Sequence, residues 1–170
     1  MNSQRILLAG GLLLFLLSAF TGLYYDLVLR PAQHTAASYT LDMALNMATK
    51  GDPAMAAAFA GEFASLSLLQ EIHARLPVHL AFAGAAAIAP VWLVAKLDIS
   101  EQMKRMLALL IVGGGLLLGA GDILQSMGHA LPGRYVVFGG YAWIALGLGA
   151  YSLYAGLFIW LNTEPQAKRR

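Results

Sequence analysis

The stretch MLALLIVGGGLLLGAGDILQ, residues 106–125, has 20 residues and one ionisable side chain, that of Asp122. A bilayer core about 30 Å thick needs roughly 20 apolar residues in a helix to cross it, because backbone polar groups cannot be left unpaired in hydrocarbon. Three further stretches meet this requirement, at about residues 6–29, 76–97 and 135–161. The sequence therefore predicts an all-α integral membrane protein, a four-helix bundle that forms a single membrane domain over residues 1–170.

The composition of the whole chain agrees with this prediction. Of its 170 residues, 59% are apolar and 12% are charged, a balance that a water-soluble globule of this size would hardly conceal. The first apolar stretch also resembles a secretory signal peptide, since Arg5 lies in a short basic segment before it. Its apolar part is long, and no clear small-x-small cleavage site follows, so we expect a retained membrane span.

The segment between the first two spans, residues 30–75, is the only long connection, and its composition is typical of helix. Residues 38–49 (SYTLDMALNMAT) have a partly amphipathic pattern, and Gly51 is expected to end this helix. Asp52 and Pro53 then stand where the N-cap and first residue of a new helix would. We expect the new helix to run into the second span or stack on it.

The other two connections, residues 98–105 and 127–134, are short, so the second, third and fourth spans are expected to be antiparallel neighbours. Small residues recur in the spans and allow close approach of helices. In the third and fourth spans these are Gly113, Gly114, Gly115, Gly119, Gly121, Gly139, Gly140, Gly147, Gly149 and Gly156.

The distribution of Lys and Arg favours both termini in the cytoplasm, in a bacterial-type inner (plasma) membrane. This orientation places on the inside Arg5, Lys96, Lys104, Arg105, Lys168, Arg169 and Arg170, and on the outside Arg30, Lys50, Arg75 and Arg134. The same sidedness explains the net charge of +2, which needs no nucleic-acid partner. The absence of cysteine excludes disulfides, thiolate zinc sites, iron–sulfur ligation and covalent c-type haem attachment.

Ionisable residues concentrate on the outer half in this orientation, which suggests a site near the outer interface. Ionisable groups inside a span are costly and are therefore functional candidates. Asp122, near the outer end of the third span, is the clearest case, and Asp26 is a weaker one. His34 is expected in an exposed loop and His129 in a turn.

The segment from Glu71 to His79 is the densest cluster of such residues. On a helix, Glu71, Arg75 and His79 share one face at i, i+4 spacing, whereas His73 points almost the opposite way. A helix end that forms salt bridges at the membrane interface would also have this composition.

Two kinds of metal centre can be compared with these residues. A site of imidazoles and carboxylates would draw on His73, His79, His129, Glu71 and Asp122, but no HExxH or Glu-x-x-His spacing is present. Haem is easier to accommodate, because it needs one axial imidazole, an apolar slot and cations for two propionates. His73 would be the ligand, Arg134 and Arg75 the cations, and the glycine-rich third and fourth spans the slot.

Two short motifs resemble those of the styrene oxide isomerases, four-span membrane enzymes of nearly this length. The family has Arg-x-His, then a Pro, then an Asn six residues after the His; here His73 takes the His position and His79 that of the Asn. A family segment resembling Asn-Arg-Gly-x-x-Phe-Gly is matched by Gly133-Arg134-Tyr135-Val-Val-Phe138-Gly139.

The resemblance implies a homotrimer that binds haem b through His73, with Tyr135 in the matching cofactor segment. Ferric iron would act as a Lewis acid on the oxygen of a small hydrophobic epoxide, and a hydride shift would give the aldehyde without net redox change. The chain departs from the family at His79 and in the third span, where Asp122 or Gln125 stands nearest to the position of a substrate-positioning Tyr. His79, Asp122 and Gln125 are therefore the candidate catalytic residues.

Two other functions remain open from the sequence. The chain could be a non-catalytic small subunit of a larger respiratory or oxidase-type membrane complex, which would dock on Met43, Met47, Met55, Phe59 and Phe63. It could also carry protons or metal ions through Asp122 and Asp26, although no inverted repeat is evident and four helices leave little room for alternating access.

Overall fold

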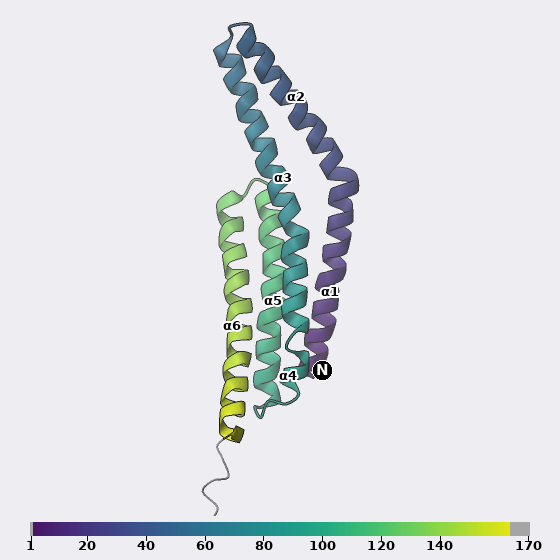
Figure 1. The fold of residues 1–170 in the computed structure, drawn as a ribbon, viewed down its shortest axis with the longest axis vertical. Coiled ribbons are helices and arrows are strands. Elements are labelled where there is room, and N and C mark those ends of the chain that lie inside the picture. The colour runs from purple at the N-terminus through teal and green to yellow at the C-terminus, as the bar shows by residue number, and fades with distance from the viewer. Residues whose placement is uncertain (1, 164–170) are drawn as a thin grey trace, which may run out of the picture.

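The computed structural model describes residues 2–163 and consists, over this range, of helices joined by short turns (Figure 1). The helices are α1 (Ser3–Tyr24), the π-helical segment η1 (Tyr25–Leu29), α2 (Arg30–Thr49), α3 (Pro53–Ile88), α4 (Val91–Val94), α5 (Glu101–Ser126) and α6 (Ala130–Thr163). Four helical stretches are long and apolar enough to cross a membrane. The predicted all-α class and the four candidate spans are confirmed, whereas Lys168, Arg169 and Arg170 lie outside the described residues.

The segment predicted as a helical loop is an extension of the first two spans. α1 continues through η1 into α2 without a turn, and α2 and α3 form a hairpin that projects beyond the bundle (Figure 1). The hairpin turns at Gly51, whose φ of +77° suits glycine. A side-chain oxygen of Asp52 then accepts a hydrogen bond of 3.0 Å from the Met55 N–H, so the predicted start of this helix is confirmed.

The second span is interrupted near its end. α3 stops at Ile88 and the chain turns at Pro90 into the short α4, so the candidate span runs through Val94, close to the predicted end at about Leu97. Ala89 keeps helical φ and ψ angles and donates to the Ala85 carbonyl, but Pro90 has no backbone N–H to continue the hydrogen-bond pattern, which explains the end of α3. α5 then starts after Ser100, whose hydroxyl accepts a hydrogen bond from the Met103 N–H.

Glycines bring α5 and α6 into direct backbone contact. A Cβ atom on Gly114 would lie 2.7 Å from the Gly140 carbonyl oxygen, and one on Gly121 would lie 2.8 Å from the Gly133 carbonyl oxygen. At these positions the glycine-rich faces of α5 and α6 pack directly against each other. The prediction of a haem slot between them is wrong, because glycine here permits close packing of backbone and leaves no crevice.

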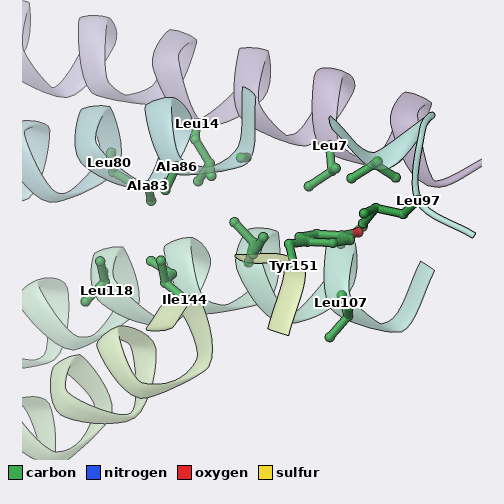
Figure 2. Packing of buried hydrophobic residues seen from close by; sticks show 14 of the residues in the cluster. Leu7, Leu14, Leu80, Ala83, Ala86, Leu97, Leu107, Leu118, Ile144 and Tyr151 are labelled. Atoms are coloured by element: carbon green, nitrogen blue, oxygen red, sulfur yellow. The ribbon is translucent and has the colours of Figure 1, made fainter. Parts of the chain in front are cut away.

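Buried aliphatic side chains from α1, α3, α5 and α6 point toward one another along the bundle (Figure 2). Tyr151 of α6 is the largest fully buried side chain among the described residues, and its hydroxyl donates a hydrogen bond of 2.7 Å to the Lys104 carbonyl. Ser18 of α1 likewise donates to the Pro77 carbonyl of α3 at 2.7 Å. These bonds fix α6 on the first turn of α5 and α1 on α3, and the second of them lies at Pro77, between His73 and His79 in the sequence.

Gly114→Ala is expected to lower the free energy of unfolding by about 1–3 kcal/mol, because the new methyl group meets the Gly140 backbone rather than a movable side chain. Gly139→Ala is the matched control, since nothing lies within 4 Å of a Cβ atom there. That variant should be unchanged or more stable by up to about 1 kcal/mol. Unfolding of both variants in detergent measures the difference, and equal stabilities would contradict the packing described here.

Candidate functional site

Two histidines of α3, six residues apart, face different neighbours. His73 contacts side chains of η1 and α2, whereas His79 contacts side chains of α5 and α6. Six residues at about 100° each rotate by one full turn and a further two thirds of a turn. The two imidazoles therefore project from different sides of α3. α3 therefore carries two polar sites, one on each side.

His73 lies in the wall of a cavity of about 480 Å³, a volume within the usual range of small-molecule sites. The cavity lies mainly between the C-terminal part of α1, η1 and α3, and its lining is mostly apolar and aromatic. The lining residues are Phe20, Thr21, Tyr24, Tyr25, Leu29, His73, Leu76 and Ser126.

The side-chain amide of Gln33 holds the His73 ring in place, with 2.8 Å between Gln33 Nε2 and His73 Nδ1. The buried Gln33 Oε1 has no hydrogen-bond partner among the described residues. Exchanging the positions of the Gln33 amide oxygen and nitrogen places Oε1 next to His73 Nδ1. There Oε1 accepts a hydrogen bond from Nδ1–H. In this tautomer Nε2 carries the free lone pair, which is the arrangement that a metal-ligating histidine has with its supporting carbonyl.

The predicted propionate cations and Tyr135 do not line this cavity. Arg75 forms an ion pair with Glu71 on the exposed side of α3. Arg134 and Tyr135 are exposed near the start of α6, and Tyr135 is 75% accessible. Of the four predicted cofactor-binding residues, only His73 lies at the cavity.

His79 and Asp122 form the second site. The distance between His79 Nδ1 and Asp122 Oδ2 is 2.6 Å, and the Asp122 side chain is only 2% exposed. Asp122 is buried because its neighbours Gly119 and Gly121 let α3 and α6 pack closely on α5, through Leu80 and Gly133 respectively. The structure thus brings together two of the three predicted catalytic residues.

Aromatic rings border this second site. The Tyr141 ring of α6 stands nearly perpendicular to the His79 imidazole, with 5.6 Å between ring centroids, and Phe82 lies 6.1 Å from Tyr141. Gln125, the third predicted catalytic residue, does not join them. Its amide donates a long hydrogen bond of 3.4 Å to the Gly121 carbonyl, and its side chain lies against Gly133.

The remaining candidates are dispersed. Asp26 forms an exposed ion pair with Arg30, 3.3 Å apart. His34 is exposed on α2, which is helix where a loop was expected, and His129 lies at the predicted turn before α6. Within residues 2–163, no three His, Cys, Asp or Glu side chains come together as a metal ion would need.

Gln33 and the aromatic wall of the cavity were missed from the sequence, because residues 30–75 were treated as a separate segment. A signal was present: Tyr25, Leu29 and Gln33 follow i, i+4, i+8 spacing and share a face of a continuous helix. No known protein family, curated protein or solved structure matches this chain.

Proposed function

We propose that this chain is a multi-pass membrane enzyme that binds haem b through His73 and isomerises epoxides to aldehydes without net redox change. One observation carries the cofactor: His73 stands in the wall of an aromatic cavity with Nδ1 held by Gln33. No hydrogen bond to His73 Nε2 occurs in the part of the chain that the structure describes. The reaction comes from the resemblance to the styrene oxide isomerases.

The residues around His73 fit a haem group. Haem needs one axial imidazole and apolar walls, and Phe20, Tyr24 and Tyr25 offer flat side chains for such a wall. With the Gln33 amide turned, Oε1 accepts from His73 Nδ1–H in the tautomer that ligation requires, and the amide nitrogen takes the buried position that has no protein partner, so the number of hydrogen bonds is unchanged. Bound there, ferric haem b would supply a Lewis acid that polarises the epoxide oxygen.

The chain's own side chains then have distinct tasks. Gln33 fixes the orientation and tautomer of the His73 ring, and the aromatic lining keeps water away from the reacting epoxide. Arg30, next to the lining residue Leu29, would have to leave its exposed ion pair with Asp26 to meet a propionate. Arg134 and Tyr135 are exposed on α6 and do not line the cavity of their own chain, and in a homotrimer they could meet the cofactor of a neighbouring copy.

The proposed orientation keeps both termini in the cytoplasm of a bacterial-type inner membrane. The Lys and Arg distribution supports it. The α2–α3 hairpin would then project from the outer surface, and both histidine sites would lie in the outer half of the bundle. Trp92, 84% exposed at the end of the bundle away from the hairpin, is a typical residue for the inner membrane–water interface.

The enzymatic part is tested with the purified, haem-loaded protein and styrene oxide that carries deuterium on its terminal carbon. The expected product is phenylacetaldehyde in which one deuterium has moved to the neighbouring carbon, formed without any added reductant or oxidant. The matched control is the same protein heated until it unfolds, because free haem is then present without the cavity. If the folded protein releases no more aldehyde than this control, the isomerase function is wrong.

The α2–α3 hairpin favours a second candidate, a non-catalytic subunit of a larger membrane complex. It extends beyond the bundle and exposes apolar side chains such as Tyr39, Leu45 and Met55, which another subunit could cover. Mild solubilisation and sizing separate the two functions. A homo-oligomer that retains haem counts against the subunit, and recovery only within a hetero-complex counts against the enzyme.

A further inference from the structure

The His79–Asp122 pair is a second polar site that the proposed haem chemistry does not use. Asp122 is almost completely buried in an apolar bundle, and His79 is its only ion-pair partner among the described residues. The pair lies where α3 meets α5 and α6, whereas the cavity at His73 lies mainly where α3 meets α1 and η1, with Ser126 of α5 at its edge. The two sites can therefore act on different molecules.

Charge balance decides which atoms of the pair carry protons. A net charge in an apolar interior is costly, so the stable forms are imidazolium with carboxylate, or neutral imidazole with carboxylic acid. In the first form His79 Nδ1–H donates to Asp122, and in the second the acid O–H donates to Nδ1. Both forms leave a proton on His79 Nε2, which is therefore a hydrogen-bond donor.

This donor has no protein partner within residues 2–163, and it is not sealed inside the bundle. The His79 side chain is 15% exposed, and the aromatic side chains next to it, Tyr141 and Phe82, are also exposed. In a membrane this surface meets lipid tails, which contain no acceptor. An unpaired N–H group in hydrocarbon is unfavourable, so an apolar molecule that offers an oxygen acceptor would be preferred over lipid there.

We propose that His79 Nε2–H binds the carbonyl oxygen of a flat, lipid-soluble ring compound, such as a quinone or an aryl ketone. The carbonyl satisfies the exposed donor, and Asp122 strengthens the bond by sharing the charge of the imidazole. The ring lies against Tyr141 and Phe82, whose faces suit stacked or edge-to-face contacts. The ligand enters sideways from the membrane between α3 and α6 and does not pass through the His73 cavity.

The test compares menadione, a naphthoquinone, with 2-methylnaphthalene, which has the same ring skeleton without the carbonyl oxygens. Binding to the full-length protein in detergent is measured by titration calorimetry, after subtraction of partition into empty micelles. The wild type is expected to bind menadione about tenfold more tightly than the hydrocarbon, as one charge-assisted hydrogen bond implies. Menadione, and not the hydrocarbon, should shift the Nε2 resonance of His79 in protein labelled with ¹⁵N-histidine.

Two variants complete the design. His79→Leu/Asp122→Val removes the donor together with the carboxylate and should bind both probes alike, whereas His73→Ala should keep the preference for menadione. The second result would hold even if the protein bound no haem, so this inference and the proposed function can fail separately. Equal binding of the two probes by the wild type, or a preference that survives in the double variant, would overturn the proposal.

Discussion

His73→Ala is expected to remove haem from the purified protein, because His73 is the only imidazole in the lining of the cavity. Loss of a residue that merely supports a metal ligand typically costs about 10–100-fold in metal affinity, so loss of the ligand itself should cost more than about 100-fold. The Soret absorbance per chain and the haem b extracted from the protein measure the effect. The ring is only part-buried, so the bundle should still fold.

Two further variants test whether the loss of haem is specific to His73. His34→Ala removes an exposed imidazole of α2 and should leave the Soret band unchanged. Gln33→Leu removes the group that holds His73 Nδ1, and haem affinity should fall by about 10–100-fold without being abolished. A His73→Ala protein with an undiminished Soret band would place the cofactor elsewhere.

The second large effect is expected at the other histidine. His79→Leu should lower the free energy of unfolding by about 3–5 kcal/mol, because it leaves the carboxylate of Asp122 buried without its partner. Reversible unfolding in mixed detergent micelles, at constant pH, gives the difference. The loss arises from the buried polar group of Asp122 left without its partner, since leucine and histidine fill similar volumes.

The double variant His79→Leu/Asp122→Val separates that cause from packing. With both polar groups replaced by apolar ones, most of the lost stability should return, as replaced buried ion pairs often show. If the double variant is instead as unstable as the sum of the two single variants, the pair contributes through shape and not through charge.

Local patterns in the sequence predict much of this fold. Length and apolarity predict the four spans, and the Gly51-Asp52-Pro53 signal predicts the turn of the hairpin. Helical periodicity also predicts that His73 and His79 leave α3 in different directions. Each of these depends on residues that are close together in the chain.

The neighbours of each helix face could not be predicted in the same way. The glycines of the third span allow close approach, but the sequence does not tell whether the approaching group is a cofactor or the backbone of another helix; here Gly140 and Gly133 approach. Gln33 meets His73 only because α1 continues through η1 into α2, across residues that look like the start of a loop. The Gln33–His73 contact joins residues 40 positions apart, and the glycine contacts join residues 26 and 12 positions apart, beyond the reach of local periodicity.

The absorption spectrum of the purified wild-type protein decides whether the His73 cavity holds haem. A Soret band is expected in constant proportion to the amount of folded chain, in protein prepared from cells that make haem b. A folded protein that is colourless, and stays colourless after haemin is added and the excess removed, would contradict it.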